Sequence, residues 1–293
     1  MKLLFRTLIL SLIIILALNF KNTKERSMSA QTKNDIEFKS GYSDVYGIKM
    51  YYEIHGNGKP LVLIHGGGST IGTSFSKLIP LLENRFIIIA IELQAHGHIS
   101  DRDTAESFER DADDVVKLLH NLNINKASIL GFSNGGNTAI QIAIRHPEIV
   151  NKLILASTFY KREGIIPGFF DGMKKATIED MPQSLKNAFL KINPDRVRLL
   201  NMFNKDRERM LNFKDWKDED IRSIEAPTLI INGDRDVILP QHAVAISKLI
   251  INSRLMILPS AHGSYFGVAE SPSTGSNLLK MTADVIKNFL NEK

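Results

Sequence analysis

The sequence predicts an α/β fold in which a mostly parallel sheet is flanked by helices. Short, wholly apolar segments recur along the chain, and such segments are typical of strands that are buried on both faces. Segments with helical periodicity lie between them, and this alternation implies right-handed crossovers and parallel strands. With 293 residues, of which 43% are hydrophobic, the chain can bury a sizeable core in one or two domains.

Eight strands are expected along the chain. The first two, Ile36–Gly41 and Val45–Ile54, are expected to pair antiparallel around a turn at Ser43 and Asp44. The other six are the apolar segments that should form the parallel part of the sheet: Leu61–Ile64, Phe86–Ile91, Ala127–Phe132, Lys152–Ala156, Thr228–Ile231 and Leu255–Leu258.

Four helices are expected between or after these strands. The segment Ser107–Leu122 has its apolar residues on one face, and Asn134–Arg145 stops before a proline. Pro240–Ile250 opens with proline, which suits the first turn of a helix, and Asn277–Leu290 lies near the end of the chain.

One interval, from Thr158 to Glu225, interrupts the alternation. It contains no convincing strand but many large apolar residues interleaved with charges and prolines. A structureless loop of this length is improbable in a compact domain. We therefore expect residues 158–225 to form a helical cap insertion over one end of the sheet, and residues 31–157 and 226–293 to form the core.

The composition excludes several classes of function. The chain has no cysteine, which rules out disulfides, thiolate metal sites and a cysteine nucleophile. Almost all of the net charge of +5 lies in residues 1–30, so the remainder is nearly neutral. We therefore expect no nucleic-acid partner, because a phosphate backbone calls for a basic surface.

The N-terminal segment resembles a targeting sequence. Lys2 and Arg6 precede the uncharged run Thr7–Phe20, which is shorter than the roughly 20 residues of a membrane-spanning helix. We expect residues 1–30 to be a signal peptide or an N-terminal membrane anchor, with residues 7–20 as the tether in the second case. Either interpretation predicts a protein that is exported, to the periplasm or outside the cell, or membrane-anchored.

A five-residue motif predicts a nucleophile. Gly131-Phe132-Ser133-Asn134-Gly135 follows an apolar strand and opens a helix, which is the setting of a nucleophile elbow. Small residues flank the serine in such a turn because the backbone there is tight. The turn lifts the Ser133 hydroxyl away from the sheet edge.

A base and an acid follow in the chain order that serine hydrolases of this type use. His262 follows the last predicted strand, and Asp234 and Asp236 follow the strand before it. Loops at the carboxyl ends of parallel strands converge, so these groups can meet the serine. Asp236 is favoured as the acid because its loop feeds directly into the helix that begins at Pro240.

The oxyanion of such a reaction needs N–H donors. Residues 65–69 read HGGGS after a strand, and glycines let backbone N–H groups approach a developing alkoxide. The expected pair is the N–H of Gly67 and that of Asn134. The run lacks the lysine of a phosphate-binding loop, and His96 and His98 lack a third metal ligand in sequence, so no cofactor or metal is expected.

Together these motifs resemble the α/β-hydrolase superfamily, most closely its capped esterase, carbon–carbon hydrolase and haloperoxidase-like group. The resemblance covers about residues 36–290 and depends on the HGGG loop, the GFSNGG elbow, the GDRD acid loop and the AHG base loop. It implies an eight-stranded α/β-hydrolase sheet with a helical cap.

The function expected is that of a cofactor-free serine hydrolase acting on a small or medium, fairly apolar ester or related acyl substrate. Ser133 would attack the carbonyl, His262 would carry its proton, and Asp236 would orient the imidazole. The same residues could instead serve a carbon–carbon hydrolase, an aminopeptidase or a perhydrolase. A ligand receptor with only slow turnover is a further alternative.

Overall fold

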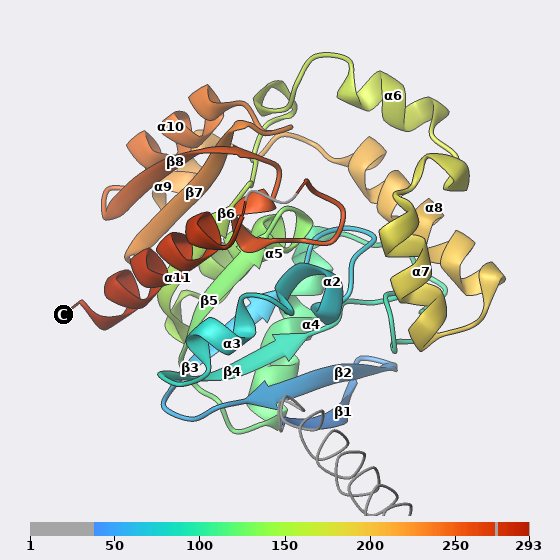
Figure 1. Ribbon diagram of the computed structural model, residues 1–293, viewed down its shortest axis with the longest axis horizontal. Coiled ribbons are helices and arrows are strands. Elements are labelled where there is room, and N and C mark those ends of the chain that lie inside the picture. The colour runs from blue at the N-terminus through green and yellow to red at the C-terminus, as the bar shows by residue number, and fades with distance from the viewer. Residues whose placement is uncertain (1–37, 273–274, 293) are drawn as a thin grey trace, which may run out of the picture. The chain divides into compact units, whose positions relative to one another are not determined.

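An eight-stranded, mostly parallel sheet crosses the protein in the computed structural model, which describes residues 38–272 and 275–292 (Figure 1). The strand order is β1-β2-β4-β3-β5-β6-β7-β8, and the predicted fold class is confirmed. The strands are β1 (Lys39–Val45), β2 (Ile48–His55), β3 (Lys59–Ile64), β4 (Phe86–Ile91), β5 (Ala127–Phe132), β6 (Val150–Ala156), β7 (Thr228–Arg235) and β8 (Ser253–Ala261).

The central strands are the apolar segments that the sequence marks. Every residue of β5 is buried, because helices cover both faces of the sheet at this point. β8 is the edge strand of the sheet and has several exposed residues. Polar residues can therefore belong to it, and the strand is longer than the apolar segment Leu255–Leu258 that the sequence marks. The pairing of β7 with β8 continues to Arg235 and Ala261, beyond the predicted strand ends.

The turn between the first two strands differs from the prediction. Ser43 and Asp44 are not the turn: they pair with Met50 and Lys49 within the β1–β2 ladder. The chain reverses at Tyr46 and Gly47, whose φ angles are 41° and 91°. Positive φ at both central residues is what a two-residue type I′ hairpin requires, and glycine adopts it without cost.

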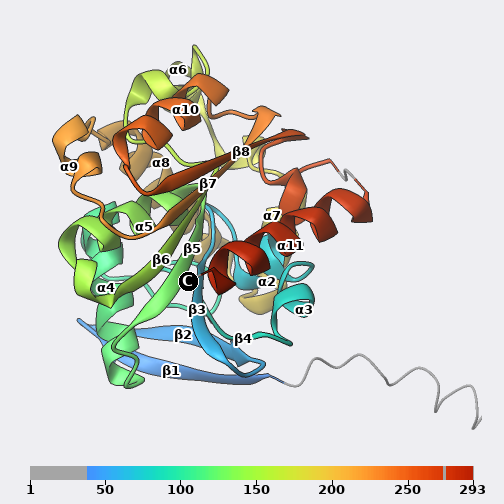
Figure 2. The same ribbon diagram turned by 90° about the vertical axis from the view of Figure 1, so that its left-hand side faces the viewer.

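Helices cover both faces of the sheet (Figure 2). On one face lie α4, α5, α9 and α10, and on the other lie α3 and α11. Each predicted helix is found, with its ends within one residue of the prediction. The helices of these layers are α3 (Ile79–Leu82), α4 (Phe108–Asn121), α5 (Asn134–Arg145), α9 (Asp218–Arg222), α10 (Pro240–Leu249) and α11 (Ser276–Asn291), and the short α2 (Ile71–Phe75) precedes α3.

The segment between β6 and β7 is helical, and no strand occurs within its described residues 158–225. It contains α6 (Phe169–Lys175), α7 (Gln183–Ile192) and α8 (Arg196–Asn212) before α9 (Figure 1). Side chains of α7 and α8, together with Ala95 and Met181, form a small apolar cluster that is separate from the main core. Ile221 and Ile224, near the end of the segment, instead pack into the main core.

The targeting prediction falls on residues 1–30, which lie outside the described residues. Within the part of the chain that the structure describes, no helix has the length and apolar character needed to cross a bilayer.

The hairpin geometry predicts the effect of replacing Tyr46. Its side chain is 63% exposed, so a change there removes little packing. Tyr46→Asn should stabilise the protein by about 0.5 to 1 kcal/mol, because asparagine tolerates positive φ better than tyrosine does. Urea unfolding of the purified protein measures this difference. The matched control is Gly47→Ala, where an added Cβ would meet no other atom within 4 Å. This variant should be less stable by about 1 kcal/mol, because alanine disfavours the positive φ of this position. A loss of stability in Tyr46→Asn would contradict this account of the turn.

Candidate active site

Ser133 occupies a strained turn between β5 and α5. Its φ and ψ angles are 53° and −122°, which is a conformation that residues other than glycine rarely adopt. The Ser133 N–H donates to the carbonyl of Ala156 in the neighbouring strand at 2.9 Å. The turn is therefore tied to the sheet, and the serine stands at the carboxyl end of β5.

The glycines of the motif are required by close backbone contacts. A Cβ on Gly131 would lie 2.1 Å from the carbonyl oxygen of Gly135, and one on Gly135 would lie 2.2 Å from that of Ile64. Any larger residue would push α5 away from β3 and β5. The G-x-S-x-G spacing therefore follows from the approach of the helix to the sheet.

His262 reaches the serine from the loop that follows β8. Its Nε2 lies 3.1 Å from Ser133 Oγ, within hydrogen-bonding distance. Its Nδ1 lies 2.7 Å from Asp236 Oδ1. The Phe132 ring packs against the imidazole, with ring centroids 4.9 Å apart. The structure thus brings together the serine, histidine and aspartate that the sequence singles out.

The two acids of the β7 loop have different positions. The carboxylate of Asp236 faces His262 and also accepts the Ile238 N–H at 3.0 Å. Asp234 turns away and accepts the Ser260 N–H at 2.8 Å, which fastens the end of β8. The preference for Asp236 over Asp234 therefore agrees with the contact to the histidine.

Two residues around Asp236 were missed by the sequence reasoning. The Ser157 hydroxyl donates to Asp236 Oδ2 at 2.5 Å, and the Tyr265 hydroxyl lies 2.6 Å from Ser157 Oγ. Ser157 has φ of 51° and follows β6, at the sheet edge where an acid can also stand. The position of Ser157 directly after a strand is the feature of the sequence that could have indicated it as a partner of the acid. Nothing local in the sequence indicates Tyr265 as a partner of Ser157.

The hydrogen bonds fix the charges of the pair. Burial by itself raises the pKa of Asp236, but the nearby His262 and the bonds from Ile238 and Ser157 hold it below its usual range. Burial lowers the pKa of His262, and the charge and hydrogen bond of Asp236 more than offset this, so its pKa lies above 6.5. Asp236 is thus an anion that favours a proton on the imidazole.

The expected N–H donors lie beside the serine. Gly67 and Asn134 line the same cavity as Ser133. Asn134 is the first residue of α5, so its N–H has no partner within the helix and the helix dipole adds positive potential. A Cβ on Gly67 would lie 2.5 Å from Asn134 Nδ2, so a larger residue there would displace the Asn134 side chain.

The cavity above the serine is mostly apolar. Its volume is about 350 Å³, and both Ser133 and His262 open into it. Much of its lining comes from the segment between β6 and β7. The apolar side chains from this segment include Phe159, Ile165, Phe169, Met181, Leu185 and Met210.

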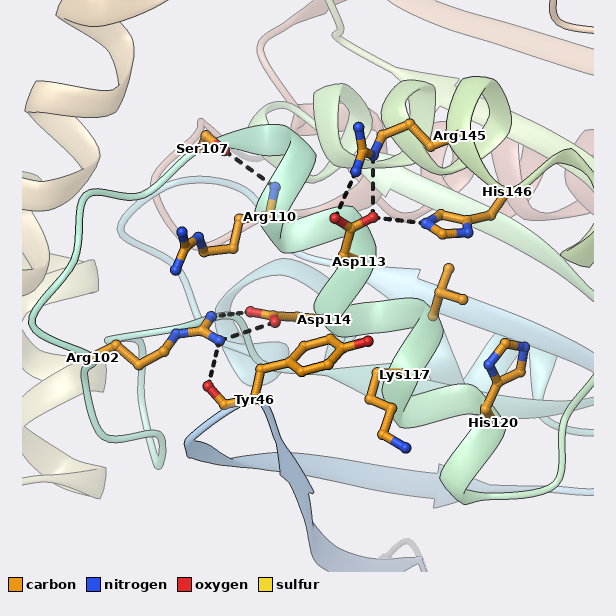
Figure 3. Close-up of a pocket in the computed structure, with 11 residues that line it drawn as sticks. Tyr46, Arg102, Ser107, Arg110, Asp113, Asp114, Lys117, His120, Arg145 and His146 are labelled. Carbon is orange, nitrogen blue, oxygen red and sulfur yellow. Dashed lines mark hydrogen bonds and ion pairs between the residues drawn. The ribbon is translucent and has the colours of Figure 1, made fainter.

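A second, larger pocket of about 700 Å³ lies along α4 (Figure 3). Part of its charge is held in ion pairs: Asp113 pairs with Arg145 and His146, and Asp114 pairs with Arg102. Arg110 and Lys117 line it outside these pairs, so the pocket is basic. Among the described residues that line it, none belongs to the set predicted for catalysis. The apolar cavity with the serine is therefore the candidate active site.

The remaining histidines of the sequence motifs have separate hydrogen-bond partners, although the His65 and His96 rings pack with centroids 4.9 Å apart. His65 donates from Nδ1 to the Gly66 carbonyl and accepts the Leu93 N–H, and burial lowers its pKa to about 3, so it is neutral. His98 pairs with Glu92 at 2.9 Å, and His96 pairs with a different carboxylate. These residues hold the loops after β3 and β4 in place.

Comparisons with known proteins identify the family. The model of the alpha/beta hydrolase fold matches residues 59–187. The AB hydrolase superfamily protein YisY of Bacillus subtilis is 31% identical over 75% of this chain and 90% of its own. The serine hydrolase BPHL of Homo sapiens is 29% identical over 73% of this chain and 77% of its own.

A solved structure supports the same fold. The structure of a serine hydrolase involved in carbazole degradation, the CarC enzyme, superposes with a TM-score of 0.71 at 23% sequence identity. The superposition covers 87% of this chain and 99% of that chain. With this sheet, this elbow and these relatives, the chain belongs to the α/β-hydrolase family and is an enzyme of that type.

Proposed function

We propose that the protein is a cofactor-free serine hydrolase in which Ser133, His262 and Asp236 act as a catalytic triad on an apolar acyl substrate. The observation that carries this proposal is the continuous chain of contacts from Ser133 Oγ through both ring nitrogens of His262 to Asp236. A nucleophile, a base and an orienting acid in this order are what acyl transfer through a serine requires.

The reaction proceeds in two halves. Ser133 Oγ attacks the substrate carbonyl while its proton passes to Nε2 of His262, and a tetrahedral oxyanion forms. The oxyanion collapses, the bond to the leaving group breaks, and His262 gives the proton to the leaving oxygen. Water then attacks the acyl-serine with His262 again as the base, which releases the acid and restores Ser133.

Two features of the chain stabilise this sequence of charges. Asp236 favours the imidazolium that exists in each half, and it holds Nδ1 protonated so that Nε2 faces the serine. The N–H groups of Gly67 and Asn134 are proposed to donate to the oxyanion, since both residues line the cavity beside Ser133.

The cavity suggests the class of substrate. An apolar lining with few polar groups favours a hydrophobic acyl or alcohol group next to the scissile bond. Residues 158–225 act in this proposal as a cap, because their side chains supply much of the lining. A volume of about 350 Å³ suits a small or medium ester.

Replacing the nucleophile tests the triad directly. Ser133→Ala should reduce turnover of a p-nitrophenyl ester by at least about 10³-fold, since no other group can form the acyl intermediate. Steady-state kinetics with purified protein measure the loss, and thermal unfolding shows whether the variant is folded. The control is Ser247→Ala on α10, which should leave turnover unchanged. Undiminished activity in Ser133→Ala would refute the proposal.

The pH dependence follows from the charge on His262. Because the base must be neutral in the free enzyme and its pKa is raised, kcat/KM should rise with pH to a midpoint above that of an ordinary histidine. In Asp236→Asn the larger of the two charges that raise this pKa is gone, while Glu270 remains, so the midpoint should move to lower pH while the maximal rate falls steeply. A pH–rate profile of both proteins measures the shift. A midpoint that moves to higher pH in the variant would be inconsistent with this role of Asp236.

A series of esters with one leaving group tests the cavity. Burial of one methylene contributes about 0.8 kcal/mol, or roughly fourfold in kcat/KM. We expect p-nitrophenyl esters to improve by about this factor per carbon until the cavity is full. An ester whose acyl chain has the same length but ends in a hydroxyl group should lack the increase in kcat/KM that the last methylene of the all-carbon chain provides. A flat or falling series would show that the acyl group does not occupy the apolar cavity.

A further inference from the structure

A buried hydrogen bond joins α8 to the glycine loop after β3. Asp206, on α8, accepts the Gly68 N–H at Oδ2, with the two atoms 2.5 Å apart. The same oxygen lies 2.9 Å from Nε2 of His96, in the loop after β4. One carboxylate oxygen of α8 therefore contacts both the loop after β3 and the loop after β4, which are distant from α8 in the sequence.

The other oxygen of Asp206 anchors the carboxylate to the core. Arg209, one turn along α8, pairs with Asp206 Oδ1 and with Asp111 of α4, the latter at 2.6 Å. The Arg209 and Asp111 side chains are each 2% exposed. Because both oxygens of Asp206 are held by buried partners, the carboxylate has no freedom to follow a moving loop.

The bond lies next to the proposed oxyanion site. Gly68 N–H belongs to the peptide group that joins Gly67 to Gly68, so holding it sets the orientation of Gly67. An added Cβ on Gly67 would lie 3.3 Å from Asp206 Oδ2, which shows how close the carboxylate is. Asp206 lines the cavity together with Ser133.

A carboxylate at this place needs compensation. A fixed negative charge near a developing oxyanion opposes the reaction unless cations balance it. Burial lowers the pKa of His96, but the charge and hydrogen bond of Asp206 raise it to about 9, and Arg209 stays charged. Asp206 and Asp111 are therefore balanced by two cations, His96 and Arg209, and the network can hold the loop without repelling the oxyanion.

We propose that Asp206 is a positioning residue of the hydrolase reaction, which holds the Gly67–Gly68 peptide so that the Gly67 N–H faces the oxyanion. This inference rests on the proposed function. It also assigns α8 a part in the reaction besides lining the cavity: the helix supplies the acceptor that orders the oxyanion loop.

The test compares two double variants of equal charge. Asp206→Asn with Arg209→Met and Asp206→Ala with Arg209→Met have the same net charge, and both remove the Arg209 partner of Asp111, so the two variants differ only in the group at position 206. His96 Nδ1 donates to the Gln94 carbonyl at 2.7 Å, so a neutral His96 presents a lone pair at Nε2. In Asp206→Asn the amide oxygen can take the place of Oδ2 and accept the Gly68 N–H. In the alanine variant the acceptor left near the Gly68 N–H is Nε2 of His96, which lies 3.2 Å from Gly68 N.

We expect the alanine pair to have a kcat about tenfold or more below that of the asparagine pair, with KM within about threefold. A trifluoromethyl ketone, which adds to the serine and forms an oxyanion, should lose affinity in proportion to kcat/KM. The matching methyl ketone binds without forming a stable oxyanion and should bind both variants alike. Equal kcat in the two double variants, or equal losses for the two ketones, would overturn the inference.

A second contact of the same kind serves as the control. Asp101 lies in the loop after β4, as His96 does, and pairs with Lys205 of α8 at 2.7 Å. This ion pair does not involve the glycine loop. Asp101→Asn should lower the melting temperature without lowering kcat. If it lowers kcat as Asp206→Ala with Arg209→Met does, the effect is general loosening of α8 and the inference fails. Activity retained in Ser133→Ala would instead overturn the proposed function, so the two failures are distinguishable.

Discussion

The hydrogen bond between Ser133 Oγ and Nε2 of His262 is the contact on which the rest of the site depends. It joins residues that are 129 positions apart in the chain. A parallel sheet makes this contact available, because the carboxyl ends of β5, β7 and β8 lie at one edge and each carries a loop. The strained backbone of Ser133 then raises the hydroxyl toward the imidazole.

The surroundings of the site divide their roles between charge and shape. On the acid side, Asp236 is held by the histidine, by Ser157 and by a backbone N–H, so that its oxygens have defined partners. On the side proposed to hold the oxyanion, the three glycines of the loop have no side chains of their own, and other segments contact the loop. Asp206 provides one of these contacts from α8. The helical segment thus contributes to the shape of the cavity and to the order of the loop beneath it.

Much of the fold could be predicted because the strands of this sheet are short and apolar on both faces. β4 and β5 have the predicted bounds for this reason. The prediction was wrong at the first turn, where Ser43 and Asp44 looked like turn residues but Tyr46 and Gly47 reverse the chain. The reason is physical: a two-residue hairpin is selected by backbone twist and positive φ, which a polar pair does not by itself provide.

The sequence alone determined the order of strands and helices and the residues that lie at strand ends, because apolar runs, glycine spacing and the nucleophile-elbow motif are local signals. It also indicated which acid faces the histidine. Only the tertiary structure decided the partners that come from distant segments. Asp206 meets Gly68 and His96 across 138 and 110 positions, and Tyr265 meets Ser157 across 108. Such contacts arise from how helices pack over the sheet, and no local spacing encodes that packing.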